Sequence, residues 1–305
     1  MANAAGAAPG GHRNRFWGVL SLPGVAWLMA LFVVPFYAIG AVAFGRVDPI
    51  LRTPDPVWSP LSWDFSAMGK VVGRVFNSDL RGVAVRTVSY VGLSLALCCL
   101  IGYPVAYYVA RHASRWRGVL LAALVMPFWI SYLMRMLAWV NLLQVDGYIN
   151  SVLRWFHLGG SRNWLDGDWS TVVVGLVYGY IPFFILPLYA ALERLDKRLL
   201  EAGRDLGASP ARVFRSITLP LSIPGLMAAG VITVLPMFGD YYTNTFLSSG
   251  SPRTEMIGNQ IERDLRGSSQ SQTGASLVLL LSAALLVLMT YYLVVTVRAQ
   301  RSVAT

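Results

Sequence analysis

Charged residues are scarce in this chain of 305 residues, because Asp, Glu, Lys and Arg together make up only 13% of it. That share is about half of what a soluble domain usually carries, while hydrophobic residues reach 55%. The scarcity argues against a soluble enzyme held by one anchor and indicates a single polytopic membrane domain. The net charge is +10, and basic loops in so apolar a chain more often face the cytoplasm and acidic lipids than a nucleic acid.

Lysine is nearly absent. Neither Lys70 nor Lys197 lies in a glycine-rich loop followed by Ser or Thr, the arrangement that cradles nucleotide phosphates in P-loop proteins. We therefore expect that the chain does not bind ATP in that way.

Cysteine and histidine are also rare. Cys98 and Cys99 are adjacent in an apolar run, and on a helix they point about 100° apart, so we interpret them as small core residues. The histidines, His12, His112 and His157, are far apart in the sequence. Zinc-binding patterns and the Gly-x-Ser-x-Gly pattern are missing as well. We predict no catalytic residue, no metal site and no cofactor bound by this chain.

Six long apolar runs account for most of the chain, and each is near or above the ~20 residues that a helix needs to cross a bilayer. The runs cover residues 16–44, 83–110, 119–143, 171–192, 221–247 and 275–297. We predict an all-α membrane protein with six transmembrane helices. The predicted organisation is a tail at 1–15, a six-span domain at 16–298 and a second tail at 299–305.

The first run could instead be a signal peptide, since basic residues precede it and Ala41-Val42-Ala43 resembles a cleavage site. Its apolar core is much longer than the ~7–15 residues of a signal peptide, so we favour an uncleaved span. Pro23 and Pro35 are expected to kink it.

The loop charges predict the orientation. If both ends, the 111–118 turn and residues 193–220 are cytoplasmic, these segments hold 13 Lys/Arg and 4 Asp/Glu, and the opposite loops hold 10 of each. The excess of basic residues on one side predicts that both termini are in the cytoplasm.

Residues 193–220 form a polar, basic stretch between two apolar runs. The spacing of its leucines predicts a helix from Leu195 to Leu206, which Gly207 would end. Ser209 is a good N-cap and Pro210 a good first-turn residue for a second short helix. We expect this helix to offer an apolar surface to a partner. Its surface residues would be Val213, Phe214 and Ile217. An ordinary amphipathic cytoplasmic loop is the alternative.

This stretch resembles the EAA signature of the permease subunits of bacterial ABC importers. The spacing matches throughout, and the one departure is a glycine at the third position, where alanine is usual, which could loosen the helix. The matching residues are Glu201, Ala202, Gly203, Gly207, Ile217, Leu219 and Pro220. The resemblance implies a MetI-like permease bundle in the bacterial inner membrane, with residues 193–220 as the loop that docks into a separate ATPase.

From about Val83 to the C-terminus, the sequence looks similar to the spermidine/putrescine branch of these permeases. The segments that carry this resemblance are 134–139, 146–150, 195–209, 235–241 and 257–261. Permeases for iron, sulfate, amino acids or phosphonates share much of this pattern, so they remain alternatives. The resemblance implies an ATPase dimer that binds ATP and Mg²⁺, a second, related permease and an external polyamine-binding protein as partners, along with membrane lipid.

Ionisable residues inside spans are functional candidates by default. Arg86 is close enough to a span end to reach head groups, whereas Arg135 and Asp240 lie at similar depth near the outer edge of the membrane and could pair. Gly239 and Pro236 make a regular helix at Asp240 improbable. We hypothesise that Asp240 binds an ammonium group with the help of nearby aromatic side chains. The candidates for these are Tyr241, Tyr242, Trp139, Tyr178 and Tyr180. A purely structural Arg135–Asp240 pair is the alternative.

Two other classes of function remain. An ion-coupled secondary transporter would be expected to carry acidic residues near the middle of the membrane, whereas Asp240 is the one acid inside the predicted spans. A membrane-embedded enzyme would need a catalytic cluster, and the sequence offers none.

Overall fold

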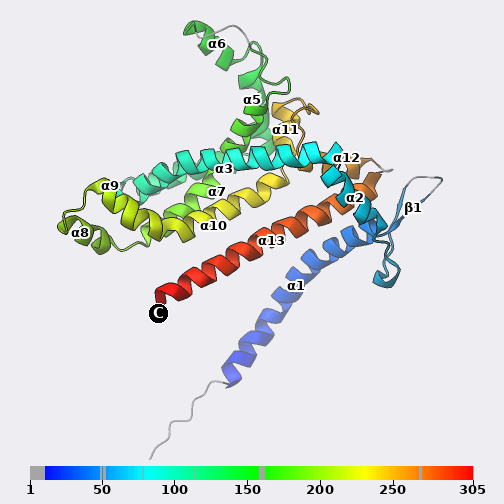
Figure 1. Cartoon of the computed structure of the whole chain (residues 1–305), viewed down its shortest axis with the longest axis horizontal. Helices are drawn as coiled ribbons and strands as arrows, with labels where there is room; N and C mark the ends of the chain where they lie inside the picture. The colour runs from blue at the N-terminus through cyan, green and yellow to red at the C-terminus, as the bar shows by residue number, and fades with distance from the viewer. Residues whose placement is uncertain are drawn as a thin grey trace, which may run out of the picture. The chain divides into compact units, whose positions relative to one another are not determined.

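The computed structural model describes residues 11–48, 50, 53–77, 79–113, 115–157, 162–267 and 270–304. Helices dominate the described residues (Figure 1). The chain divides into two compact units, one of residues 1–71 and 264–279 and the other of residues 72–263 and 280–305. The candidate sites lie in the second unit.

The first unit contains α1 (Gly11–Ala43) and a two-stranded antiparallel ribbon of β1 (Arg46–Val47) and β2 (Pro54–Asp55). A short turn, η1 (Pro60–Ser62), and the start of α2 (Ser66–Asn77) follow. Aromatic rings pack together at the end of α1: Phe44 lies 4.9 Å from Trp63 and 4.7 Å from Phe65, between ring centroids.

Helix α1 is longer than predicted. It begins at Gly11, inside the segment that we predicted as an N-terminal tail, and residues 1–10 of that tail lie outside the described residues, as does Thr305 of the second tail. Pro23 and Pro35 lie inside the helix without ending it.

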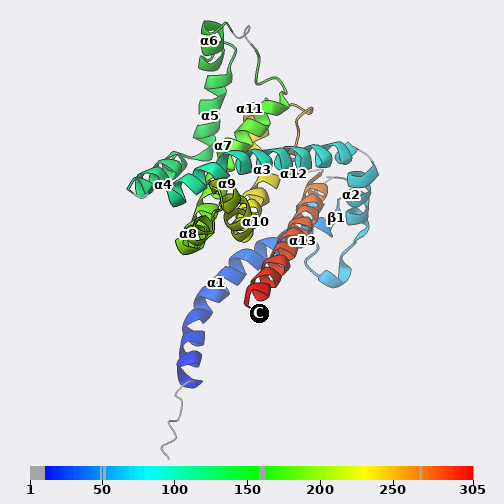
Figure 2. The ribbon, with the colours of Figure 1, turned by 60° about the vertical axis from the view of Figure 1, so that its left-hand side comes forward.

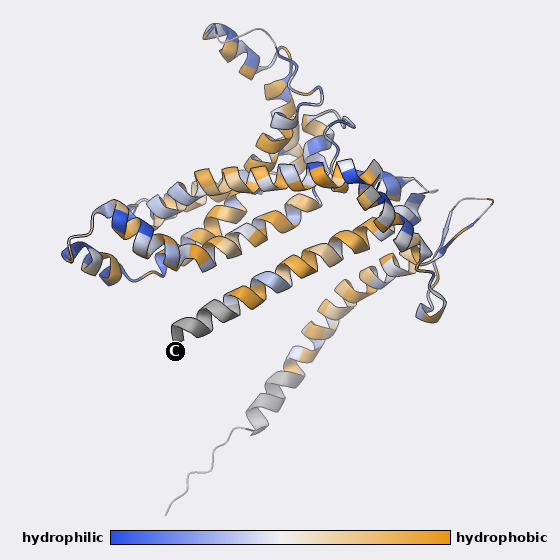
Figure 3. Cartoon of the chain, viewed as in Figure 1, coloured by the Kyte–Doolittle hydropathy of each residue, from blue (hydrophilic) through white to orange (hydrophobic). Residues whose placement is uncertain are grey.

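The core of the second unit is a layer of three helices that lie side by side, α3 (Asp79–Arg111), α7 (Trp169–Glu193) and α10 (Leu219–Phe238) (Figures 1 and 2). Glycines let them approach closely: a Cβ on Gly102 of α3 would lie 2.7 Å from the Phe184 ring. A hydrogen bond of 2.8 Å between Tyr103 and Ser222 joins α3 to α10. Figure 3 shows that these helices are mainly apolar, as membrane spans should be.

The predicted third span, 119–143, is wrong as one continuous helix. Helix α4 (Arg117–Val125) and the 3₁₀ turn η2 (Met126–Trp129) end before Ile130, and α5 (Tyr132–Leu143) starts after Ser131. The two parts meet at 90°. Pro127 tightens the turn, Ile130 is extended, and the Ser131 side chain accepts a hydrogen bond from the Met134 amide, which caps the new helix.

Five helices of the described residues are long and apolar enough to cross a membrane, and the bent pair raises the number to six if it is one span. The fifth is part of α13 (Ser271–Ala304). The remaining helices are short: α6 (Tyr148–Trp155), α8 (Lys197–Asp205), α9 (Pro210–Val213), α11 (Tyr242–Leu247) and α12 (Ile257–Arg266).

Candidate functional site

The stretch that joins α7 to α10 forms the predicted hairpin. Asp196 caps α8, accepting a hydrogen bond of 2.9 Å from the Arg198 amide. Gly207 ends the first arm in the left-handed region, with φ +80°, where glycine carries no steric penalty. Ser209 caps α9 by accepting from the Arg212 amide, and Pro210 occupies the first turn. The predicted turn chemistry is confirmed.

The second arm of the hairpin, α9, differs from the prediction in two respects. It is not a separate short helix, because it continues through a π-helical segment, η3 (Phe214–Thr218), directly into α10. Its apolar side chains also face inward. Val213 is buried, and Phe214 packs edge-on against Tyr103 and Tyr107, at 5.8 and 5.6 Å between ring centroids. Phe214 therefore joins the hairpin to α3, and neither residue forms an outward surface.

Gly203 is the departure from the EAA signature, and it packs against the second arm. It is buried in regular helix, and a Cβ there would lie 2.8 Å from Ile217 Cδ1. Its helix is intact, so the expected loosening does not occur. The missing side chain lets the two arms approach.

The outward surface of the hairpin comes mainly from the first arm and the turn. Leu206 is 88% exposed and Leu199 49% exposed. Glu201, Ala202 and Pro220 are exposed as well, whereas Leu219 is half-buried. Three exposed arginines accompany them, Arg204, Arg212 and Arg215. The result is an apolar and basic surface of the kind that fits a groove on a partner.

The hairpin is connected to the helices around it. Arg111, at the end of α3, donates a hydrogen bond of 3.0 Å to the Leu195 carbonyl, and Arg117 forms an ion pair with Glu193. Helix α10 then runs for 20 residues from the hairpin, a length of about 30 Å. Figure 1 shows α8 and α9 at one end of the three-helix layer and α11 at the other. One continuous helix, α10, therefore links the hairpin to the far end of the layer.

At that far end α10 stops at Phe238, and Asp240 lies in the break before α11. The predicted irregular backbone at Asp240 is confirmed. The side chain is buried, with 5% exposed. Three hydroxyl groups donate to its Oδ2, those of Tyr132 at 2.8 Å, Tyr180 at 3.0 Å and Thr243 at 2.6 Å. The Thr243 amide donates to Oδ1 at 3.0 Å. The carboxylate is thus held by neutral donors from α5, α7 and α11.

The hydroxyls of Tyr132, Tyr180 and Thr243 form what we call the hydroxyl cage. Arg135 is buried beside it, with 7% of its surface exposed. Its guanidinium carbon lies 4.1 Å from the Phe128 ring centroid and 5.1 Å from that of Tyr132. Within the described ranges Arg135 forms no ion pair, and its Nε and Nη1 have no hydrogen-bond partner. Arg135 and Asp240 therefore share Tyr132 without pairing.

The predicted aromatic candidates fall into two groups. Tyr241 and Tyr242 stack at 4.1 Å, and Tyr242 lies 6.1 Å from Tyr132, which lies 6.3 Å from Tyr180. Tyr132 and Tyr180 contact Asp240 through their hydroxyls, and Tyr242 and Tyr241 extend this group of rings from Tyr132. Trp139 and Tyr178 form a separate edge-on pair at 5.3 Å. Tyr178 is two residues before Tyr180, so it faces about 200° away around α7.

Sequence reasoning missed Tyr132 and Thr243. Both follow breaks in apolar segments, and Tyr132 stands three residues before Arg135, on the same helix face. The three-residue spacing from Arg135, a charge inside a predicted span, could have identified Tyr132 as a candidate.

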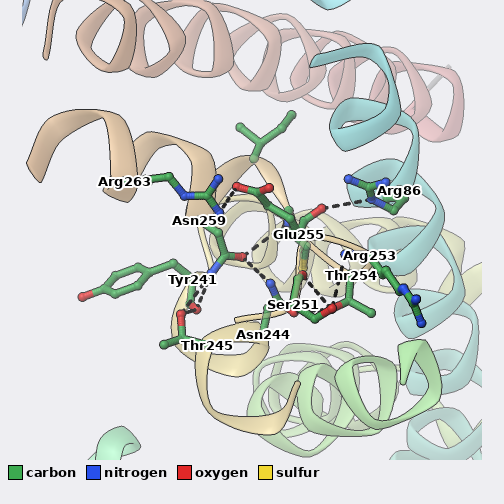
Figure 4. Close-up of polar contacts among 12 residues, drawn as sticks. Arg86, Tyr241, Asn244, Thr245, Ser251, Arg253, Thr254, Glu255, Asn259 and Arg263 are labelled. Carbon is green, nitrogen blue, oxygen red and sulfur yellow. Dashed lines mark hydrogen bonds and ion pairs between the residues drawn. The ribbon is translucent and has the colours of Figure 1, made fainter. Parts of the chain in front are cut away.

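The segment after α11 holds the break at Asp240 in place (Figure 4). Asn259 donates to the Tyr241 carbonyl at 2.9 Å and accepts from Asn244 at 3.1 Å. Arg86 Nε donates to the Glu255 carbonyl at 3.3 Å, so it contacts this segment, and its contact with head groups stays a prediction. Arg263 pairs with Glu255 at 2.7 Å. These bonds anchor α12 to α3 and to the loop around Asp240.

The sequence matches the family model of the binding-protein-dependent transport system inner membrane component over residues 102–302. Among curated proteins, it is 34% identical to the spermidine/putrescine transport system permease protein PotB of Haemophilus influenzae, over 74% of this chain and 77% of that protein. PotB of Salmonella typhimurium strain SL1344 is 29% identical over 82% of this chain and 83% of its own length.

Solved structures of ABC transporters share the fold. A bacterial ABC transporter involved in the import of alginate superposes with a TM-score of 0.71 at 18% identity, covering 94% of this chain and 96% of that one. The MetNI methionine ABC transporter gives a TM-score of 0.52 at 21% identity, covering 72% and 94%.

Proposed function

Because the chain belongs to the binding-protein-dependent transport system inner membrane components, the permease subunits of ABC importers, we propose that its cargo is a polyamine and that ATP hydrolysed on a partner drives the import. The chain is a multi-pass protein of the bacterial inner membrane. Membership of the family does not specify the cargo, the partners, or the roles of the hairpin and of Asp240, and these are the parts that we propose.

One observation supports a cationic cargo above the others. The buried carboxylate of Asp240, at the end of α10, accepts hydrogen bonds from the hydroxyls of Tyr132 and Tyr180. A carboxylate beside aromatic faces suits an ammonium group, through charge and cation–π attraction. The curated relatives named above are spermidine/putrescine permeases by name, which agrees with this chemistry. In the present conformation hydroxyl groups take the place that the ammonium would take.

The hairpin supports the proposed coupling. A partner ATPase dimer, which binds ATP and Mg²⁺, would contact Leu199, Leu206 and the neighbouring arginines. Movement of the hairpin would pass along α10 to Gly239 and Asp240, because η3 joins the hairpin to α10 without a break. The hydroxyl cage around Asp240 would then open or close with the state of the ATPase.

Two further partners complete the proposal. A second, related permease would form the other wall of the path, and an external polyamine-binding protein would deliver cargo to the outer loops, 45–82, 144–170 and 248–274. A structure of the alginate transporter contains its periplasmic protein, which illustrates such a complex in a protein of the same fold.

The test is uptake by the reconstituted complex. Proteoliposomes with the complete transporter and its binding protein should take up radiolabelled spermidine or putrescine only with ATP. Asp240→Asn keeps the shape of the side chain and removes its charge, so uptake should fall by about tenfold or more, as for the loss of a charged contact of ~1.4 kcal/mol or more. Unchanged polyamine uptake by a normally assembled Asp240→Asn complex would contradict the proposed role of Asp240 in cargo binding. If the complex takes up an anionic or neutral solute instead, the proposal that the cargo is a polyamine is wrong.

A further inference from the structure

Two buried groups of opposite charge lie on either side of one tyrosine without pairing. The Tyr132 hydroxyl donates to Asp240, and the Tyr132 ring lies under the Arg135 guanidinium. In the part of the chain that the structure describes, no carboxylate is within 4.0 Å of Arg135. One tyrosine side chain thus contacts both charged groups.

Arg135 lacks the partners that a buried arginine normally has. Arginine stays protonated in proteins, and an unpaired buried charge is destabilising, above all inside a membrane protein. The Phe128 and Tyr132 rings compensate part of that cost. Nε and Nη1 nevertheless remain without hydrogen-bond partners among the described residues. An arrangement of this kind points to a second state in which the guanidinium is paired.

Asp240 can be its partner in that state. The carboxylate is held here by neutral hydroxyls, and a cation binds a carboxylate more strongly than a hydroxyl does. Tyr132 and Arg135 lie three residues apart on α5. A rotation of α5 by about 60° about its own axis would therefore move Tyr132 away from Asp240 and bring Arg135 to that side. The extended residue Ile130 separates α5 from α4.

We propose that Arg135 is a tethered cation that competes with the cargo for Asp240 and so determines which cations can pass. The inference rests on the proposed function and assigns Arg135 as its specificity-determining residue. When the hydroxyl cage opens without cargo, the guanidinium pairs with Asp240, and sodium or potassium finds no free carboxylate. A polyamine displaces the guanidinium because it brings several ammonium groups and an alkyl chain that tyrosine rings can hold.

The experiment measures the leak of inorganic cations. Proteoliposomes with the complete transporter, its binding protein and ATP are loaded with a thallium-sensitive dye, and thallium entry is followed without polyamine. Arg135→Gln removes the charge and keeps a polar side chain, whereas Arg135→Lys keeps a cation. Arg135→Gln should raise thallium entry during ATP turnover by about tenfold, the factor that corresponds to ~1.4 kcal/mol of lost competition. Arg135→Lys should stay close to the unmodified protein.

A double variant tests whether the leak depends on Asp240. Adding Asp240→Asn to Arg135→Gln should abolish the extra thallium entry, because the attracting carboxylate is gone. Normal ATP hydrolysis and co-purification of each variant exclude a folding defect. A leak that Arg135→Gln does not raise, or that Asp240→Asn does not remove, overturns the proposal. The readout contains no polyamine, so failure of the cargo proposal would appear separately, as missing uptake by the unmodified transporter.

Discussion

Gly258 packs against the backbone of Asp240 so closely that a Cβ on Gly258 would lie 2.6 Å from the Asp240 carbonyl oxygen. The Gly239 carbonyl oxygen would be only 2.8 Å away. The first turn of α12 thus lies directly against the break between α10 and α11. The position of the buried carboxylate depends on this contact between two segments that are distant in the sequence.

Gly258→Ala should therefore destabilise the protein. The methyl group meets backbone atoms, which cannot turn aside as a flexible side chain can, so we expect a loss of about 1–3 kcal/mol. The measurement is the apparent Tm of the purified complex in detergent. Gly239→Ala is the matched control, because its Cβ would find its nearest neighbour at 3.9 Å. Equal Tm values for the two variants would contradict the close packing.

Tyr132→Phe should weaken the cage around Asp240. The variant keeps the ring under Arg135 and removes one donor to a buried carboxylate, a hydrogen bond to a charged group worth about 1.5–3 kcal/mol. We expect a lower apparent Tm, because the buried carboxylate loses one of its donors. Tyr178→Phe is the control, since the Tyr178 ring packs on Trp139 away from Asp240. Identical shifts in both variants would show that the hydroxyl of Tyr132 has no special role.

The long helices could be predicted from hydropathy, since α7 (Trp169–Glu193) matches the expected 171–192 closely. The break in the third span could not. Proline is tolerated in membrane helices because neighbouring groups satisfy the freed carbonyls, so Pro127 alone does not mark a 90° bend. The decisive features are the extended Ile130 and the cap from Ser131, and serine in a membrane helix is too common to predict that cap.

Parts of the candidate site could be predicted where the type of one residue is informative by itself. Asp240 stood out as the acid inside the predicted spans, and Gly207 and Ser209 marked the turn. Tyr132 could not be assigned to Asp240, because the two are 108 residues apart in the sequence. The apolar spacing of Val213 and Phe214 predicted a helix face correctly but not its partner, since periodicity is the same for a face that packs on the protein itself and for one that binds another protein.

Leu206→Asp should impair binding of the ATPase without affecting the fold. Leu206 is 88% exposed, so its replacement leaves no cavity, while a carboxylate at the tip of the hairpin would be desolvated in an apolar groove. We expect at least about a tenfold weaker association, the result of losing ~1.4 kcal/mol. Co-purification and titration with the isolated ATPase measure it. Leu61→Asp, at a fully exposed residue (100%) of a predicted outer loop, should bind the ATPase normally. Equal weakening by both variants would rule out a specific contact.

Gly207→Ala should uncouple ATP hydrolysis from transport. At φ +80° the Cβ would find no atom within 4 Å, so the penalty is conformational, about 1–2 kcal/mol for the left-handed region. The turn between α8 and α9 can relieve that strain by changing its angle, which would move Leu206 relative to η3. We expect the amount of cargo imported per ATP hydrolysed to fall, while basal hydrolysis persists.

Gly250→Ala provides a control that separates strain from position. Gly250 also has a positive φ, +61°, and no atom within 4 Å of the added Cβ, but it lies in a predicted outer loop away from the hairpin. Both variants should lose similar stability in thermal unfolding, and only Gly207→Ala should lose coupling. If Gly250→Ala lowers the transport-to-hydrolysis ratio equally, general destabilisation explains the effect, and the geometry of the hairpin turn does not control transport.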